Sequence, residues 1–281
     1  MTTNIGVVFD FDDTLAPDST THLLQEYDID PDEFWNEQFR NRVQNGFDPT
    51  VAYLTLLLDH IGEDEPLGEL TPRELESCAE SLESQLYDGV PEIFDDLDDI
   101  VGEYDDVRIE YYVVSEGIES LISGSIITEY CSEIYASRLA TDEDGVFKRV
   151  KRPISFTDKT RYLFEINKGI KASEAMKNPY KVNQQRNERP VPFENIIYIG
   201  DGITDIPCFS LVKDRGGRVF GVMQQDEQSA KQEAILDIGS PQRAGNLNQP
   251  DYSPDGRLGS LLRLTIEGLC TDSTIDQLEA L

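Results

Sequence analysis

The sequence predicts an α/β fold in which a mostly parallel sheet is buried between helices. Three segments, 5–9, 107–114 and 194–200, contain short apolar runs of the kind found in strands that are buried on both faces. Helical patterns, such as the one at 91–101, lie between them. The chain has 281 residues, of which 38% are apolar, and this is enough for one sizeable core and a smaller domain.

The first predicted strand runs directly into three carboxylates, Asp10, Asp12 and Asp13. The carboxyl ends of strands in an open α/β sheet are where ligands bind, so this negative charge lies at an expected ligand site. Carboxylates this close repel one another and need a cation, a proton or water between them. A hard divalent cation is the usual partner of such oxygen ligands. Taken alone, however, the pattern is equally compatible with an acidic turn.

Four motifs in a fixed order remove that ambiguity. They are V-V-F-D-F-D-D-T-L, Y-V-V-S-E-G, T-D-K-T and I-Y-I-G-D-G-I-T-D. Together they resemble the haloacid dehalogenase-like hydrolase superfamily over roughly residues 4–222. The first and fourth motifs are highly specific, whereas the two short ones gain their meaning from their placement. The fourth motif and the position of a helical insertion resemble the phosphoserine-phosphatase-like branch.

The resemblance implies a three-layer Rossmann-like core with an inserted all-helical cap domain. The core would comprise residues 1–16 and 89–281, and the cap residues 17–88. Helix-start signals support the insertion: Asp48-Pro49-Thr50 can cap one helix, and Thr71-Pro72-Arg73-Glu74 forms a capping box for another. In this superfamily such an insertion closes over the active site and selects the substrate. The alternative is that these helices belong to a single core.

The resemblance also implies the chemistry of the carboxylates. Asp10 would be the nucleophile and would form an aspartyl-phosphate. Asp12 would protonate the leaving oxygen and then deprotonate the attacking water. Mg²⁺ would be held by the carboxylates of Asp10 and Asp201 and the main-chain carbonyl of Asp12, with Asp205 as a ligand directly or through water.

The phosphoryl group would be held by Ser115, Glu116 and Lys159. We expect Ser115-Glu116-Gly117 to open a helix, where a hydroxyl and backbone N–H groups can bind phosphate, although an ordinary N-cap gives the same pattern. Lys159 lies early in a predicted helix, where the helix dipole disfavours a cation, so an anionic partner is expected. Lys168, near the end of that helix, is the competing candidate. Thr14 would brace the first loop.

These residues favour a Mg²⁺-dependent phosphatase that hydrolyses a small phosphorylated metabolite. Dehalogenases of the superfamily lack the second aspartate, so Asp12 argues against that activity. A phosphotransferase uses the same machinery and stays open, as does a non-catalytic phosphate- or metal-binding module. A dinucleotide-binding oxidoreductase is disfavoured because Asp205 occupies the position of the last glycine in G-x-G-x-x-G. The identity of the substrate does not follow from the sequence.

Composition limits the possible partners. The formal net charge of −31 argues against non-specific binding to nucleic acid or anionic membranes. The basic cluster at 148–152 is interpreted as a solvated hairpin edge, or else as an electrostatic aid to a phosphorylated substrate. Four scattered cysteines, no bilayer-length apolar run and no signal peptide predict a cytoplasmic protein with reduced thiols. Such acidity also fits a salt-rich cytoplasm. The oligomeric state stays open.

The last part of the chain carries no assigned function. Segments 228–236 and 257–269 have helical signals, and 240–254 resembles a loop.

Overall fold

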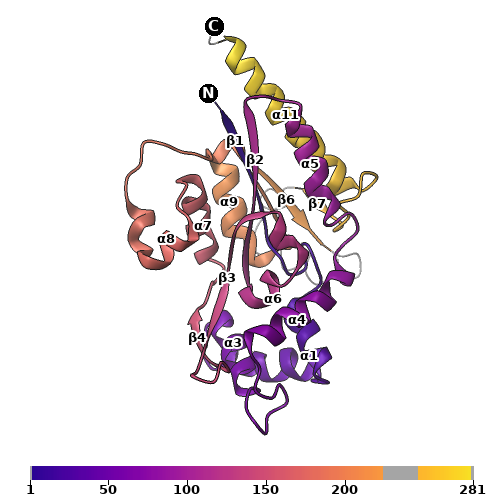
Figure 1. Cartoon of the computed structure of the whole chain (residues 1–281), viewed down its shortest axis with the longest axis vertical. Coiled ribbons are helices and arrows are strands. Elements are labelled where there is room, and N and C mark those ends of the chain that lie inside the picture. The colour runs from indigo at the N-terminus through magenta and orange to yellow at the C-terminus, as the bar shows by residue number, and fades with distance from the viewer. Residues whose placement is uncertain (1, 224–245, 280–281) are drawn as a thin grey trace.

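The computed structural model describes residues 2–223 and 246–279, and it contains one seven-stranded sheet (Figure 1). The strands lie in the order β4-β3-β2-β1-β5-β6-β7, and every neighbouring pair is parallel except β3 and β4. This confirms the mostly parallel sheet. The strands are β1 (Thr3–Phe9), β2 (Val107–Ile118), β3 (Cys131–Thr141), β4 (Phe147–Arg152), β5 (Ile196–Gly200), β6 (Arg218–Val222) and β7 (Asn246–Asn248).

Strand β1 lies at the centre of the sheet because its apolar side chains are buried on both faces. Val7, Val8 and Phe9 are fully buried. Phe9 is in register with Val113 of β2 on one side and with Ile199 of β5 on the other. The carboxyl ends of these three strands therefore meet at one edge, and the motif residues that follow them are brought together there.

Helices cover both faces of the sheet and complete three layers. Val7 and Phe9 pack in one apolar cluster with the helices α5 (Glu92–Gly102) and α11 (Arg257–Glu279). Val8, which points to the opposite face, packs in a second cluster with α7 (Asp158–Asn167) and α9 (Ile206–Asp214). The alternation of side chains along β1 thus gives each helical layer its own core.

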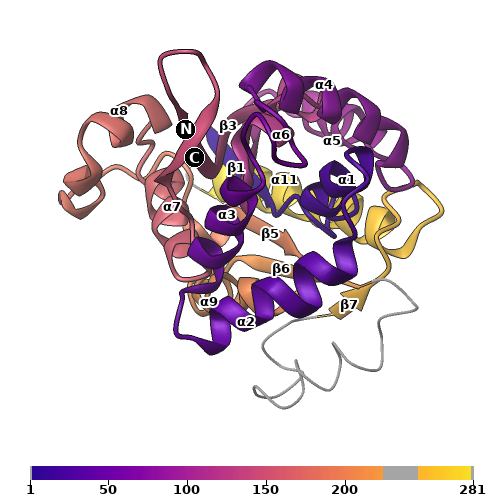
Figure 2. The same cartoon turned by 90° about the horizontal axis from the view of Figure 1, so that it is seen from below.

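The helical insertion lies below the carboxyl edge of the sheet in Figure 1 and in front of the sheet in Figure 2. Its helices pack with Leu121 of the short helix α6 (Glu119–Ser123), with Leu139 of β3 and with Phe147 of β4 in a third apolar cluster. The β3–β4 hairpin therefore contributes to the core of this part of the molecule. The helices are α1 (Ser19–Glu26), α2 (Arg40–Gln44), α3 (Pro49–Asp59) and α4 (Pro72–Leu82), with the π-helix η1 (Glu33–Phe39) and the 3₁₀ turn η2 (Glu83–Gln85).

The predicted helix starts of the insertion are observed. The carboxylate of Asp48 accepts a hydrogen bond from the backbone N–H of Val51, and Thr71 and Glu74 form a capping box. The apolar residues Phe34, Trp35, Phe39 and Val43 also predict one helix over 32–43. This is corrected, because residues 33–39 form a π-helix that passes into α2.

A second correction concerns residues 115–117, which were expected to open a helix. Strand β2 instead continues to Ile118, and α6 (Glu119–Ser123) begins only after it. The register against β3 shifts between Val114 and Ile118, and Ile118 pairs with Ser137. Ile118 is buried in the third cluster, so β2 extends beyond Ser115 before the chain turns into α6.

The remaining elements agree with the sequence in outline. The hairpin of β3 and β4 and the helix at 257–269 are confirmed, and α11 extends that helix to Glu279. The predicted helix at 228–236 and the first half of the predicted loop at 240–254 lie outside the described residues. The other short elements are α8 (Ala172–Lys177), η3 (Ile126–Glu129), η4 (Pro179–Asn183), η5 (Phe193–Asn195) and η6 (Ile203–Asp205). Within the described ranges, no helix is long and apolar enough to cross a bilayer.

Candidate active site

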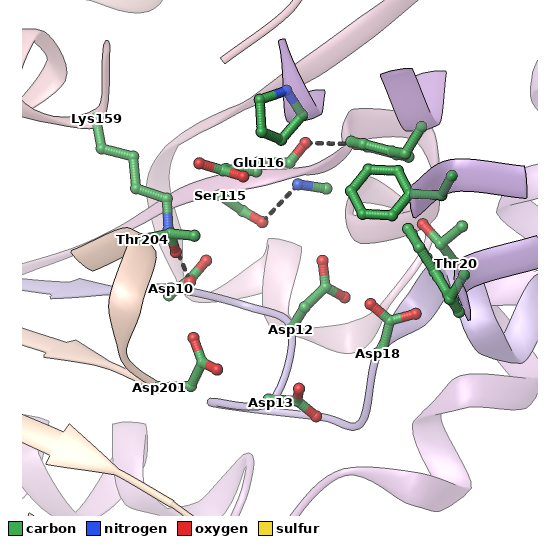
Figure 3. Close-up of a pocket in the computed structure, with 15 residues that line it drawn as sticks. Asp10, Asp12, Asp13, Asp18, Thr20, Ser115, Glu116, Lys159, Asp201 and Thr204 are labelled. Atoms are coloured by element: carbon green, nitrogen blue, oxygen red, sulfur yellow. Dashed lines mark hydrogen bonds and ion pairs between the residues drawn. The ribbon is translucent and has the colours of Figure 1, made fainter. Parts of the chain in front are cut away.

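A cavity of about 220 Å³ lies at the carboxyl edge of the sheet, where the four motifs meet (Figure 3). Asp10 follows β1, Ser115 lies near the end of β2 and Asp201 follows β5, and Lys159 reaches the same cavity from α7. The structure thus brings together residues from all four motifs.

Lys159 links two carboxylates at the bottom of the site. Its Nζ lies 2.7 Å from Oδ2 of Asp10 and 2.8 Å from Oδ1 of Asp205. The lysine side chain is fully buried, and this is tolerated because both contacts are charge-assisted hydrogen bonds. The position of Lys159 early in α7, which the helix dipole disfavours, is therefore offset by two anions. Lys168, the competing candidate, instead donates from Nζ to backbone carbonyls near 182–184.

Burial shifts the protonation equilibria of this group. It raises the pKa of Asp10 to about 6, against the opposing effect of Lys159, and the charge of Asp205 adds to the increase. Burial alone would lower the pKa of Lys159, but the charges of Asp10, Asp205 and Glu116 outweigh it, so that this pKa lies well above its usual range. Lys159 is therefore a cation, and further positive charge near Asp10 would favour the ionised form of its carboxyl group.

Asp205 has contacts that the sequence did not predict. Its Oδ1 accepts hydrogen bonds from Lys159 and, at 2.7 Å, from the hydroxyl of Tyr198, and the backbone N–H of Gly202 lies 3.3 Å from its Oδ2. A Cβ at Gly200 would lie 2.3 Å from Oδ2, so glycine is required there. Asp205 therefore positions Lys159, and its role as a metal ligand stays a prediction.

Asp12 lies on the loop that turns from β1 towards α1. Its Oδ1 accepts a hydrogen bond from the backbone N–H of Ser19 at 2.8 Å. Burial, followed by the charge of Asp18, raises the pKa of Asp12 well above its usual range. A Cβ at Gly117 would lie 2.4 Å from Oδ2 of Asp12, so only glycine leaves room for this carboxylate. A carboxyl group with a raised pKa keeps its proton to a higher pH than usual, and this suits general acid catalysis.

Ser115 and Glu116 lie beside Asp12 at the end of β2. Ser115 Oγ accepts a hydrogen bond from the backbone N–H of Gly117 at 2.9 Å, so this turn is held by the serine itself. Burial is the main cause that raises the pKa of Glu116 to about 7. Since 115–117 belong to a strand, the phosphate site proposed for them has no helix N-terminus, and their binding roles stay predictions.

The acidic residues of the site are compatible with Mg²⁺. Carboxylate oxygens of Asp10, Asp201 and Asp205 all lie within 4.8 Å of one another. Such an oxygen-only donor set suits a hard divalent cation, and a cation there would favour the ionised form of Asp10. In Figure 3 the carboxylates of Asp10 and Asp201 lie on the same side of the pocket.

Thr14 is fully buried below the loop, and its backbone carbonyl accepts a hydrogen bond from the hydroxyl of Tyr252 at 2.8 Å. The ring of Tyr252 also packs against Phe9. The C-terminal part of the chain therefore supports the first motif, a connection that was invisible in the sequence because 238 residues separate the two positions.

Several residues of the pocket were missed or given low weight. Asp13, Thr204 and the ring-bearing residues of the insertion were not assigned to it. The sequence offers Asp18, Ser19, His22, Arg40 and Arg42 as possible substrate contacts but favours surface positions for each, and of these Asp18 lines the pocket. Conversely, Arg40, Arg42 and His22 do not line the pocket; Arg42 pairs with Asp59, and His22 contacts Ser81. Residues 148–152 form β4 at the sheet edge and do not line the pocket either.

Comparison with known proteins shows the fold more clearly than the activity. No family model matches the chain. An uncharacterised protein of Borreliella burgdorferi is 29% identical over 237 residues, which cover 75% of this chain and 79% of that protein.

Solved structures confirm the predicted fold. A HAD-family hydrolase of Salmonella enterica has a TM-score of 0.53 at 12% identity, over 83% of this chain and 66% of the other. A probable phosphoserine phosphatase of Vibrio cholerae has a TM-score of 0.57 at 13% identity, over 96% of this chain and 67% of the other. The chain thus spans about two thirds of the length of each, and it has the fold of haloacid dehalogenase-like hydrolases of the phosphoserine-phosphatase type.

Proposed function

We propose that the chain is a Mg²⁺-dependent phosphatase that hydrolyses a small phosphomonoester through an aspartyl-phosphate on Asp10. The observation that carries the proposal is the meeting of Asp10, Asp12, Ser115, Lys159 and Asp201 in one cavity at the carboxyl edge of the sheet. The fold that it shares with hydrolases supports the same activity.

Each residue has a chemical task in this proposal. The Oδ1 of Asp10 is held by the backbone N–H of Phe11 at 2.8 Å, and this orients the carboxylate for attack on phosphorus. Lys159, fixed by Asp205, stabilises the negative charge of the transferring group, and the hydroxyl of Ser115 donates to a phosphoryl oxygen. Asp12 gives its proton to the leaving oxygen and then takes one from the water that hydrolyses the aspartyl-phosphate.

Mg²⁺ completes the site in this proposal. The residues that would hold it are Asp10, Asp201 and the main-chain carbonyl of Asp12, with Asp205 as the remaining predicted ligand. The ion would supply the positive charge that allows the anionic Asp10 to approach an anionic phosphate.

The decisive test is the hydrolysis of 4-nitrophenyl phosphate by the wild type and by Asp10→Asn, each with Mg²⁺ and with a chelator. We expect metal-dependent release in the wild type and a loss on the order of 10³-fold or more in the variant. A variant that keeps more than a small fraction of the wild-type rate would exclude Asp10 as the nucleophile. If neither protein releases phosphate, a rise in melting temperature with Mg²⁺ and beryllium fluoride would indicate a phosphate site that rejects the aryl group.

A further inference from the structure

The side of the pocket that belongs to the insertion is lined by three aromatic residues, Trp35, Phe39 and Tyr53, which we call the aromatic wall. Two of them come from the π-helix η1 and the third from α3. Short π-helical segments are rare and are frequent at functional sites. Since the phosphoryl group is assigned to the side of Lys159, the aromatic wall is available to the alcohol part of a substrate.

The rings of the aromatic wall are held in place by one another and by the core. The ring of Trp35 lies 5.3 Å from that of Phe39 and 6.0 Å from that of Tyr53, between centroids. Trp35 Nε1 donates to the hydroxyl of Thr21 at 2.9 Å, and the Tyr53 hydroxyl donates to the backbone carbonyl of Glu116 at 2.6 Å. Their N–H and O–H groups are therefore bound to the protein, and the rings themselves are what a ligand meets.

Acidic side chains outnumber basic ones among the described residues that line the pocket. Among the described residues that line it, Lys159 is the one basic side chain, and it already pairs with Asp10 and Asp205. A substrate that carries a second acidic group would therefore meet repulsion without a compensating cation. The acidic side chains that line the pocket are Asp10, Asp12, Asp13, Asp18, Glu116 and Asp201.

The acidic side chains of the pocket also act on Tyr53 of the aromatic wall. After burial, the charges of Asp12, Glu116 and Asp18 are the causes that raise the pKa of Tyr53 well above its usual range. Asp18 is the N-cap of α1 and lies with Thr20 on the opposite side of the pocket from Lys159 in Figure 3. A neutral apolar group could pack against the rings, but the carboxylates would not attract it. A bare metal ion would be attracted by the carboxylates, but it would not pack against the rings.

We propose that this pocket selects phosphomonoesters of amino alcohols, with the alkylammonium group against the aromatic wall and the carboxylate of Asp18. The inference rests on the proposed phosphatase function and names its substrate class. A cation over aromatic faces is attracted by the ring quadrupoles, most strongly by tryptophan, and nearby carboxylates add to that attraction. The phosphate end would then reach Asp10, Ser115 and Lys159.

The first experiment compares esters of one shape and different charge. Choline phosphate and 3,3-dimethylbutyl phosphate differ in one atom, nitrogen or carbon, and thus in charge alone, and phosphoglycolate adds a carboxylate. We expect kcat/KM for choline phosphate to exceed that for the neutral ester by on the order of tenfold, with phosphoglycolate poorest. Equal values for the charged and neutral esters would overturn the inference.

Two variants test which residues cause the preference for the charged ester over the neutral one. Asp18→Asn keeps the helix cap but removes the charge, and Phe39→Leu removes a ring, so each is expected to reduce the ratio of kcat/KM between the charged and the neutral ester several-fold. Phe47→Leu is the matched control, because Phe47 is a phenylalanine of the insertion that is 48% exposed and does not line the pocket. A control that lowers the ratio as much as Phe39→Leu would overturn the inference.

A binding measurement separates this inference from the phosphatase function. Trp35 is the single tryptophan of the chain, so its fluorescence reports directly on the aromatic wall. In Asp10→Asn, which leaves the ester intact, choline phosphate should change the emission at a concentration on the order of tenfold lower than the neutral ester. If 4-nitrophenyl phosphate is hydrolysed but this difference is absent, the substrate class is wrong and the phosphatase stands. If the difference is present but nothing is hydrolysed, the binding site stands and the phosphatase is wrong.

Discussion

Asp205 is held in the site by a contact with Lys159, a residue far away in the sequence. It lies four residues after Asp201, and the resemblance to the superfamily implies that it is a further ligand of the same metal. In the structure it also contacts Lys159 and Tyr198, and it is fully buried. The contact to Lys159 spans 46 residues, and no local pattern indicates it.

The pairing predicts a defined effect of Asp205→Asn. The variant removes one of the two charges that hold the Lys159 ammonium, so the cation is less well fixed at the phosphoryl group. We expect kcat for 4-nitrophenyl phosphate to fall on the order of 10²-fold, measured at saturating Mg²⁺. Asp158→Asn, an exposed change on the same helix as Lys159, should leave kcat within about twofold. A variant at 205 that retains the wild-type kcat would remove Asp205 from the positioning of Lys159.

Glu116 predicts a pH dependence of stability. Its pKa is raised from 4.5 to about 7 in the folded protein, mainly by burial, so ionising it in the folded state is unfavourable. Its contribution to stability is therefore present below pH 4.5 and is lost as the pH rises through about 7. Glu116→Gln does not ionise. It should be more stable than the wild type by up to roughly 3 kcal/mol at pH 8, and the difference should disappear near pH 4.5.

This prediction is checked by urea unfolding of both proteins with chelator present, at pH 5 and pH 8. Glu83→Gln, an exposed change on the surface of the insertion, is the control and should show no such pH-dependent difference. A Glu116→Gln protein that is equally stable relative to the wild type at both pH values would show that Glu116 is not held in a raised-pKa environment.

At the scale of elements, the sequence predicted best those segments whose apolar pattern alone decides the structure. Strands β1 and β5 lie where their apolar runs are, because both faces of a central strand are buried. The extension of β2 through Ser115 to Ile118 was missed because it depends on pairing with β3 and on burial of Ile118 below the insertion. The residues of this motif line the pocket, but their backbone was expected to be helical.

The π-helix η1 was missed for a related reason. The pattern of Phe34, Trp35 and Phe39 fits an α-helix and a π-helix equally well, since both place apolar residues on one side. The contact of Trp35 with Tyr53 of another helix depends on tertiary packing, which the sequence pattern does not show. The aromatic wall was therefore hidden in what looked like an ordinary apolar helix face.

The link between the C-terminal region and the first loop can be tested with Tyr252→Phe. The hydroxyl of Tyr252 donates to the buried carbonyl of Thr14, and without it that carbonyl has lost a partner. We expect a loss of about 1–3 kcal/mol in the free energy of unfolding, together with a lower kcat, because the loop carries Asp12. Urea unfolding and steady-state kinetics measure the two effects. Tyr180→Phe, at a position where the side chain is 76% exposed, should change neither, and an equal effect of both variants would contradict the link.

At the scale of the whole molecule, the order of the sheet explains why residues of four short motifs, spread over some 200 residues, meet in one cavity. The strands β2, β1 and β5 are neighbours and parallel, so their carboxyl ends form one edge by topology alone. The meeting of the motif residues at this edge was foreseen, apart from Asp13 and Thr204. The parts that come from the insertion were not, because the way helices dock over an edge depends on packing between distant segments, here with the β3–β4 hairpin.

The net charge of −31 belongs to the whole molecule and predicts its response to salt. Self-repulsion of that charge opposes the compact state, and added salt screens it as the Debye length falls from about 10 Å at 0.1 M to about 3 Å at 1 M. We therefore expect the melting temperature at pH 7.5 to rise by on the order of ten degrees between 0.1 M and 1 M KCl, as followed by circular dichroism. Near pH 4.2, the isoelectric point given by the sequence, the net charge is small, and the same increase in KCl should have much less effect. A melting temperature that does not rise with KCl at pH 7.5 would show that repulsion does not limit the stability of this fold, and it would count against adaptation to a salt-rich cytoplasm.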